Sequence, residues 1–215
     1  METLKSLRDA SKDLLELVEQ CVSSLKLSEK TKQFALNSIH TLVSAEAKLH
    51  GEKLSEVYLN EAGQVDTPAE IIGSSAALED LNIFNMKIYS TPVAVGGGSL
   101  KFSHGTVSSP APATIEMLRS AKFPMVGGPI ESELATPTGI SILVNLVDEV
   151  TCFYPPIRPI AIGYGAGAKD FAEMPNILRV VLGDPLDHDL LRDEVSVLET
   201  NLDDISGEIL GHTLD

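Results

Sequence analysis

The sequence predicts a mixed α/β protein with a partly antiparallel sheet, preceded by an N-terminal helical hairpin. Three observations lead to this fold class. Apolar residues recur at helical spacing in the first fifty residues, helix-start signals alternate with β-rich runs in the middle, and the last apolar runs follow one another without a helix between them. We expect a helical hairpin over residues 1–50, a mixed α/β domain over 51–190 and the start of a truncated C-terminal domain over 191–215.

The predicted hairpin has two amphipathic helices. The apolar positions of the first are Leu4, Leu7, Leu14, Val18, Cys21 and Leu25. Ser28 is placed to cap the second helix and Gly51 to end it. The apolar line of the second is Ala35, Ile39, Leu42, Val43 and Leu49. Steps of three and four residues put each set on one helix face.

Two helix starts in the middle of the chain combine a threonine cap with a proline. Thr67 and Pro68, with Glu70 closing a capping box, predict a helix to about Leu81. Thr136 repeats the pattern for a helix from Pro137 to about Val147. The other predicted elements are a strand at 57–59, a β-rich run at 86–95 interrupted at Pro92, a hairpin-like segment ending at His104, a helix from Pro110 or Pro112 through Leu118, and strands at 157–162, 178–182 and 195–198.

Charge and cysteine content exclude several classes of function. The chain has 31 acidic and 16 basic residues, a formal net charge of −15, which opposes binding to nucleic acid and to anionic membranes. Cys21, predicted on a helix, and Cys152, predicted on a strand, form no C-x-x-C motif. No apolar run approaches the roughly 20 residues that span a bilayer. We therefore expect a cytoplasmic protein.

Two glycine-rich segments have both a structural and a ligand-binding interpretation. Gly96, Gly97 and Gly98 either permit unusual backbone angles or expose amides to an anionic ligand. The 163–167 segment, G-x-G-x-G, resembles a nucleotide loop, but Pro175 and a strand follow where a helix is required. A tight backbone turn is the favoured interpretation of that second segment.

The candidate metal and acid–base residues lie in two loops. Glu61 and Asp66 flank Gly63 just before a helix and are suited either to a divalent cation or to the helix dipole. His104, beside Gly105, is a candidate for acid–base work or metal ligation, or is a histidine packed in its loop.

Further candidates are ligands for anions and for hard cations. Thr136, Thr138 and Gly139 present amides at a helix start, which suits a phosphate or carboxylate, although capping alone would also explain them. Carboxylates suited to Mg²⁺ or Mn²⁺ beside a nucleotide occur near the end of the sequence, at Asp203, Asp204 and Glu208.

Several blocks in order resemble one known family, the nickel-insertion proteins of the LarC type. The blocks are AEAKLHG (45–51), NEAGQVDTPAEIIG (60–73), GGG (96–98), HGTVSSPAPATIEML (104–118), ELATPTG (133–139), GYGAGAKDF (163–171), PNILR (175–179) and LETNLDDISGEILG (198–211). Together they cover nearly everything after residue 45, and their combination is specific to that family.

The resemblance implies a function for the complete protein. LarC-type proteins are CTP-dependent chelatases that insert nickel into pyridinium-3,5-bisthiocarboxylic acid mononucleotide, where the metal binds a ring carbon and two sulfurs. This implies nickel with His104, Glu61 and Asp66 as its site, His104 and Glu61 as the catalytic pair, and the 96–98 and 136–139 segments holding anionic groups.

Two departures from the family pattern shape the prediction. Tyr58 and Asn60 stand where the family usually has histidines ahead of the acid matching Glu61, which weakens the metal-binding claim for this loop. The family's nucleotide-binding domain begins at the 198–211 block. We therefore expect the CTP site, with its Mg²⁺ or Mn²⁺, to be absent from this chain, which corresponds to an N-terminal portion.

Two other functions stay open. One is a non-catalytic scaffold or metal-delivery subunit that pairs with a separate CTP-binding chain through the 1–50 hairpin. The other is a divalent-metal phosphohydrolase acting on a nucleotide-like substrate. The sequence also leaves open whether the chain forms a homo-oligomer.

Overall fold

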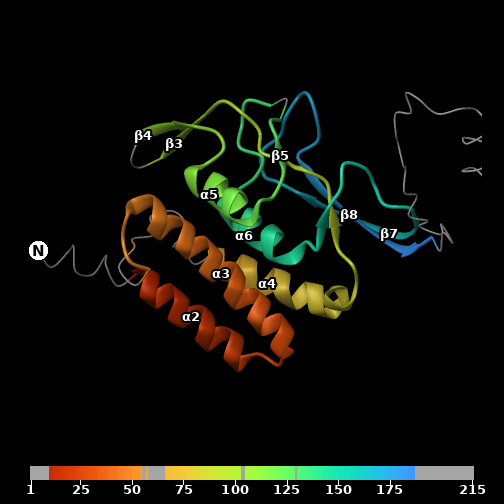
Figure 1. Ribbon diagram of the computed structural model, residues 1–215, viewed down its shortest axis with the longest axis horizontal. Coiled ribbons are helices and arrows are strands. Elements are labelled where there is room, and N and C mark those ends of the chain that lie inside the picture. The colour runs from red at the N-terminus through yellow and green to blue at the C-terminus, as the bar shows by residue number, and fades with distance from the viewer. Residues whose placement is uncertain (1–9, 55–56, 58–65, 103–104, 129, 187–215) are drawn as a thin grey trace, which may run out of the picture. The chain divides into compact units, whose positions relative to one another are not determined.

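The computed structural model describes residues 10–54, 57, 66–102, 105–128 and 130–186 (Figure 1). The helices are α2 (Ala10–Ser24), α3 (Glu29–His50), α4 (Asp66–Asp80), the short 3₁₀ helix η1 (Ile83–Asn85), α5 (Pro112–Ala121) and α6 (Pro137–Leu146). The strands are β1 (Tyr89–Ser90), β2 (Val93–Ala94), β3 (Ser99–Phe102), β4 (Gly105–Ser108), β5 (Met125–Val126), β6 (Glu149–Val150), β7 (Ile157–Ala166) and β8 (Ile177–Pro185). The predicted mixed α/β class is confirmed.

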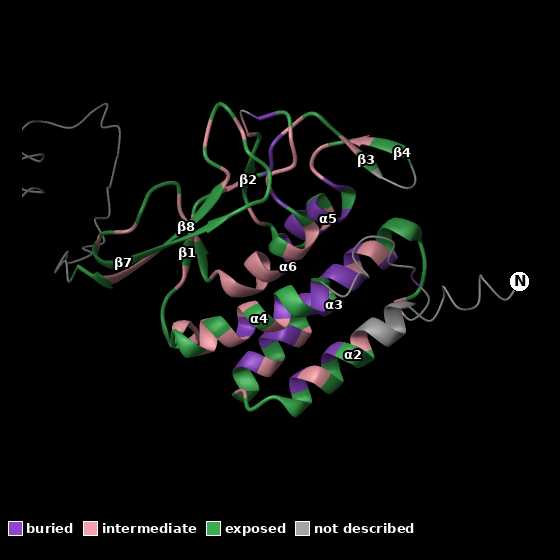
Figure 2. Ribbon diagram, turned by 180° about the vertical axis from the view of Figure 1, so that it is seen from behind, coloured by how far each residue is buried: buried purple, intermediate pink, exposed green. Residues whose placement is uncertain are grey.

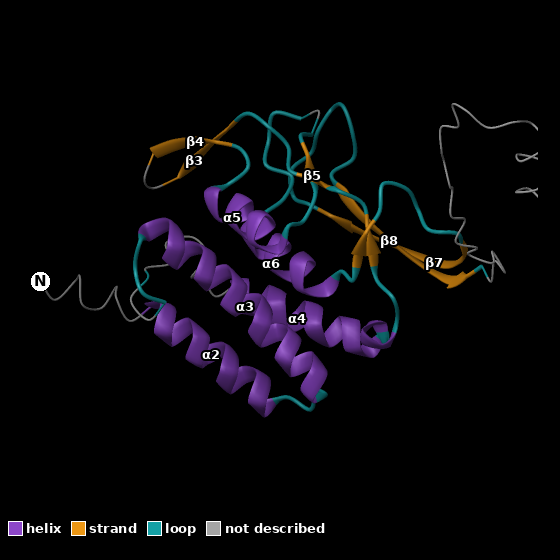
Figure 3. Ribbon diagram, in the orientation of Figure 1, coloured by secondary structure: helices purple, strands orange, loops and turns teal. Residues whose placement is uncertain are grey.

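The described strands form four separate two-stranded sheets (Figure 3). The pairs β1–β6 and β2–β5 are parallel, whereas β3–β4 and β7–β8 are antiparallel hairpins. The parallel pairs join strands that are far apart in sequence and only two residues long. The predicted mixture of parallel and antiparallel pairing is therefore present, but as short pairs and not as one continuous sheet.

The predicted helical hairpin is confirmed by α2 and α3. Ser28 caps α3, since its Oγ accepts a hydrogen bond from the Thr31 N–H at 3.3 Å, and Gly51 ends the helix with φ = +65°. Of the apolar positions whose burial the structure describes, Val18, Ala35, Ile39, Leu42 and Val43 are buried, Cys21 is half-buried, and Leu25 and Leu49 are exposed. Leu25 follows the last residue of α2 and Leu49 lies in the last turn of α3, where the packing ends.

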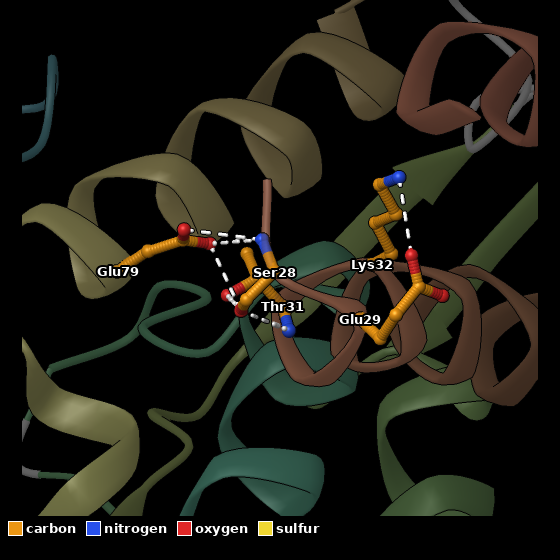
Figure 4. Close-up of polar contacts among 5 residues, drawn as sticks. All are labelled: Ser28, Glu29, Thr31, Lys32 and Glu79. Atoms are coloured by element: carbon orange, nitrogen blue, oxygen red, sulfur yellow. Dashed lines mark hydrogen bonds and ion pairs between the residues drawn. The ribbon is translucent and has the colours of Figure 1, made fainter. Parts of the chain in front are cut away.

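The corner between α2 and α3 is also tied to α4. The carboxylate of Glu79, near the end of α4, accepts hydrogen bonds from the Ser28 N–H at 3.0 and 3.1 Å and from the Ser28 hydroxyl at 3.2 Å (Figure 4). The side chain of Thr31 and the Ser28 amide lower the pKa of Glu79. Glu79 therefore acts as a second acceptor at this helix start, beside the Ser28 cap.

Helix α3 is the centre of the hydrophobic core, because it packs against α2, α4, α5 and α6 (Figure 2). The fully buried large side chains include Val18, Ile39, Leu42, Ile71 and Met117. Polar groups within this core are satisfied by the backbone. The buried hydroxyls of Ser38 and Ser75 donate to carbonyls one turn earlier, at 2.9 and 2.7 Å.

The helices α4 and α5 begin close to the predicted residues, and the start of α4 differs by one residue. Helix α4 begins at Asp66, one residue before the predicted cap Thr67, which is instead buried in the first turn. Asp66 Oδ1 accepts from the Thr67 N–H at 3.0 Å, so the aspartate side chain satisfies one of the first amides of the helix. Of the two candidate prolines for α5, Pro112 is the one that begins the helix.

The glycines at 163 and 165 lie inside a strand, so their interpretation as a tight turn is wrong. Strand β7 continues through Ala166, with Gly163 opposite Val180 and Gly165 opposite Leu178 on β8. The hairpin closes beyond them, where the Gly167 N–H donates to the carbonyl of Asn176 at 3.0 Å.

Other predictions fall near or beyond the described residues. Cys152 lies two residues past β6 and is exposed, not on a strand as predicted. Of the strand predicted at 57–59 only Val57 is described, and it is buried; the strand predicted at 195–198 lies outside the described residues. In the part of the chain that the structure describes, no helix is long and apolar enough to cross a membrane.

Candidate functional site

The glycine run at 96–98 lies against the segment that leads into α6. Gly96 and Glu133 form an isolated antiparallel bridge, the Gly97 N–H donates to the Ser132 carbonyl at 3.2 Å, and the Leu134 N–H donates to Val95 O at 3.4 Å. The backbone at 95–98 is thus held directly on the backbone at 131–134.

This approach requires glycine for two reasons. Gly96 and Gly98 have φ of +79° and +76°, in the region that L-residues with a side chain rarely adopt. A Cβ atom on Gly96 would lie 1.8 Å from the Ser132 carbonyl oxygen, and one on Gly128 would lie 2.9 Å from Gly96 Cα. The structural interpretation of the run therefore has direct geometric support, and the Gly97 amide is used within the chain. Binding of an anion by this run stays a prediction.

The second predicted anion-binding segment adjoins the first. Thr136 caps α6, with its Oγ1 accepting from the Gly139 N–H at 3.2 Å and its carbonyl accepting from the Ile140 N–H at 2.9 Å. Pro137 has no N–H, so Thr138 supplies the first helical amide that the cap does not use. Because Leu134 pairs with Val95 only two residues earlier, Thr136, Thr138 and Gly139 directly follow the segment that holds the glycines.

Two charged residues at this junction were not singled out from the sequence. Glu133, paired with Gly96, has its Oε1 atom buried. Lys169, in the loop between β7 and β8, donates from Nζ to the Ser132 hydroxyl at 3.2 Å. Both residues belong to blocks of the family resemblance, ELATPTG and GYGAGAKDF, which is the one sequence signal that could have identified them. The junction thus combines a carboxylate, an ammonium group and a helix start, a set of groups suited to a charged ligand.

The predicted metal ligands are described only in part. Asp66 lies at the start of α4, where it is exposed. Glu61 and His104 lie outside the described residues, as do Tyr58, Asn60, Asp203, Asp204 and Glu208. In the sequence, His104 falls between the end of β3 and the start of β4. Within the described ranges, no three His, Cys, Asp or Glu side chains are grouped so that they could hold a metal ion. Convergence of Glu61, Asp66 and His104 stays a prediction.

Charged groups elsewhere on the helices have structural roles. Glu116 on α5 is bound by Arg119 at 2.8 and 3.0 Å and by Lys48 of α3 at 2.8 Å, and these contacts hold the pKa of Glu116 well below its usual range. The contact with Glu116 also raises the pKa of Arg119. These side chains link α5 to α3 and leave no role for Glu116 as an acid at neutral pH.

A groove of about 350 Å³ lies at the far end of α6 from Thr136, beside α3 and η1. Its polar side chains are largely engaged within the protein: Lys30 Nζ donates to the Phe84 carbonyl, and Asn145 donates to the Thr41 hydroxyl at 3.0 Å and to Ser141 O at 2.7 Å. The Phe34 and Phe84 rings, 5.1 Å apart, form part of its wall. These hydrogen bonds join α3 to η1 and α6 to α3 along the groove.

Comparison with known proteins identifies the family. A family model described as nickel insertion protein matches residues 4–215. The chain belongs to the nickel insertion protein family. A relative from Methanothermobacter thermautotrophicus that carries the name of a nickel insertion protein is 45% identical over 203 residues, covering 94% of this chain and 48% of the relative. Similarly named relatives from Methanosarcina mazei and Dictyoglomus thermophilum are 44% and 41% identical, covering 90% and 94% of the chain and 48% and 50% of themselves.

These comparisons confirm the family resemblance seen in the sequence blocks. The chain spans about half the length of the curated nickel insertion proteins it matches. No solved structure matches it. Membership in a nickel insertion family makes nickel the metal to consider, and among nitrogen and oxygen donors nickel favours imidazole. Of the five histidines in the chain, His40 is exposed on α3 with its Nδ1 3.2 Å from the Ser44 hydroxyl, and His50 pairs with Glu46 at 3.7 Å.

Proposed function

We propose that this chain is the part of a nickel insertion protein that receives nickel and the organic acceptor, and that the complete protein inserts nickel into pyridinium-3,5-bisthiocarboxylic acid mononucleotide. The observation that carries the proposal is the family match over residues 4–215. The adjacency of the 96–98 and 136–139 segments supports it, because the acceptor carries a phosphate that needs an anion-binding surface.

The proposed anion surface lies at the start of α6. The Thr138 amide, which the Thr136 cap does not use, and the positive end of the helix dipole favour a phosphate there, and the Lys169 ammonium group, which contacts Ser132, adds a positive charge. Glu133 beside Gly96 limits how far a negatively charged group can enter. These charges support a phosphate position near Thr138 and Lys169 and away from Glu133.

The proposed metal ligands are Glu61, Asp66 and His104. Two carboxylates and one imidazole match the oxygen and nitrogen donors that bind divalent nickel. Forming a bond between nickel and a ring carbon replaces a C–H bond, so a base must accept the proton. His104 and Glu61 are the residues proposed for that role, since imidazole and carboxylate are the usual general bases.

CTP dependence is proposed for the complete protein only. The residues suited to a nucleotide-bound Mg²⁺ or Mn²⁺ are Asp203, Asp204 and Glu208, at the point where the family's nucleotide-binding region begins. CTP hydrolysis, and the lyase chemistry of the whole reaction, therefore depend on the region of the relatives that this chain does not match.

Nickel titration by calorimetry tests the proposed ligands. The unmodified chain should bind one nickel ion, and His104→Ala should lower the affinity by about tenfold or more, because an imidazole donor is lost. His40→Ala is the matched control, since His40 is an exposed helix histidine outside the proposed site. Equal nickel affinity in the His104→Ala and unmodified chains would remove His104 from the site.

The second candidate is a metal-delivery or scaffold subunit that pairs with a separate CTP-binding chain. Under this candidate, the length of the relatives that the chain does not match would correspond to the partner. The same calorimeter separates the two functions: a chain that handles the acceptor should also bind a pyridine mononucleotide, with weaker binding in Lys169→Ala. A delivery subunit should bind nickel and show no binding of the pyridine mononucleotide.

A further inference from the structure

The β7–β8 hairpin exposes large apolar side chains on both of its faces. In an antiparallel pair, residues opposite one another project to the same face. Ile162 and Tyr164 of β7 share one face and are 55% and 60% exposed. Val180 and Leu178 of β8 share the other face and are 56% and 69% exposed.

On the face that carries Val180 and Leu178, the opposite strand has glycines and no side chains. Gly163 lies opposite Val180 and Gly165 opposite Leu178, and a Cβ atom on either glycine would meet no atom within 4 Å. Glycines within a strand often mark a place where another backbone or a ligand approaches closely. On this face the β7 backbone at the two glycines is therefore accessible, next to the aliphatic side chains of β8.

No other described element packs along this hairpin over more than a few residues. A two-stranded hairpin by itself is marginally stable in water, so a ribbon of this length is expected to have further cover. The packing of the helical core cannot provide it, because the core side chains on α3 are already covered by α2, α4, α5 and α6.

Area decides which kind of partner fits. Nine residues of β8 at about 3.3 Å each, across two strands, give each face roughly 300 Å². A second copy packed on one face would bury about 600 Å² in total, below the roughly 1,000 Å² of a specific interface. A partner that covers both faces would bury about 1,200 Å², which reaches that range.

We propose that the β7–β8 ribbon is an interdomain surface, enclosed on both faces by the region of nickel insertion proteins that this chain does not match. That region is about as long as this chain in the relatives, since the match covers 48% of the Methanothermobacter protein. The ribbon is also the last element of the compact unit Met1–Pro185. The proposal rests on family membership and not on the proposed nickel site.

Hydrogen exchange tests the proposal in three arrangements. The chain is measured alone, then co-expressed with the unmatched region of the Methanothermobacter thermautotrophicus relative, and also joined to that region in one polypeptide. Amides at 157–185 should exchange rapidly in the chain alone and be protected in both other arrangements. Equal exchange in all three would overturn the proposal. Protection in the chain alone, with sedimentation as a dimer, would assign the surface to a second copy.

Variants distinguish enclosure on both faces from contact with one. Tyr164→Asp and Leu178→Asp place a charge on opposite faces, and each should weaken binding of the co-expressed region by about tenfold or more. The matched control is Leu81→Asp, at a leucine that is 61% exposed just after α4. It should leave binding unchanged. If only one of these two variants weakens binding, enclosure of both faces is contradicted. Nickel affinity should be unchanged in all three variants, which separates this test from that of the proposed function.

Discussion

Replacing Gly96 by alanine should destabilise the junction between the glycine run and the segment leading into α6. The new Cβ atom would lie 1.8 Å from the Ser132 carbonyl oxygen and 3.2 Å from Leu134 Cγ. Ordinary contacts of a Cβ atom begin at about 3.4 Å, so one of the two backbones has to move. Movement there would also disturb the Gly97–Ser132 and Leu134–Val95 hydrogen bonds.

The size of the effect follows from two separate costs. Overpacking a fixed region costs about 1–3 kcal/mol, and holding a non-glycine residue in the left-handed region costs about 1–2 kcal/mol more. The φ of +79° at Gly96 adds this second cost to the clash. We expect Gly96→Ala to lower the free energy of unfolding by about 2–5 kcal/mol.

Urea unfolding followed by circular dichroism measures this loss. Gly73→Ala is the matched control, because Gly73 lies within α4 and a Cβ atom there would meet nothing within 4 Å. That change should raise the free energy of unfolding by about 0.5–1 kcal/mol, since alanine is the better helix former. A Gly96→Ala midpoint equal to that of the unmodified chain would refute the close approach of the two backbones.

Two further predictions concern helix starts. Thr136→Ala should cost about 1 kcal/mol in urea unfolding because the Gly139 amide loses its acceptor, while Thr136→Ser should retain most of that stability; equal stability of both variants would contradict the cap. Glu79→Gln should destabilise the chain at pH 7 and not in acid. Since hydrogen bonds lower the pKa of Glu79 in the folded state, its contribution is present above the ordinary glutamate pKa of about 4.3 and is lost as the pH falls through the folded value. Unfolding curves at a series of pH values should therefore converge in acid, and a pH-independent difference between the two chains would rule out this linkage.

Much of the helical part could be predicted because its signals are local. Ser28, Thr136 and Gly51 act through the amides and carbonyls of their own helices, so their roles can be inferred from a few neighbouring residues. The buried positions of α3 follow from the helical repeat in the same way. The exceptions, Leu25 and Leu49, lie at helix ends, where burial depends on what else packs there.

The strand pairs and the candidate site depend on contacts between distant segments. Gly163 and Gly165 resemble turn residues locally, but Val180 and Leu178 on β8 pair with them and hold them in a strand. Glu133 is a candidate only because it pairs with Gly96, and Lys169 only because its side chain reaches Ser132. No periodicity or cap in the sequence indicates such pairings, which is why these two residues were missed.

Nickel affinity in a double-mutant cycle of Asp66→Asn and His104→Ala tests the central claim most directly, that Asp66 at the start of α4 and His104 are ligands to one metal ion. If both side chains bind the same ion, the double variant should lose little more affinity than either single variant, with a coupling energy of about 1 kcal/mol or more. Additive losses, or unchanged affinity in either single variant, would show that the two residues do not share a nickel site.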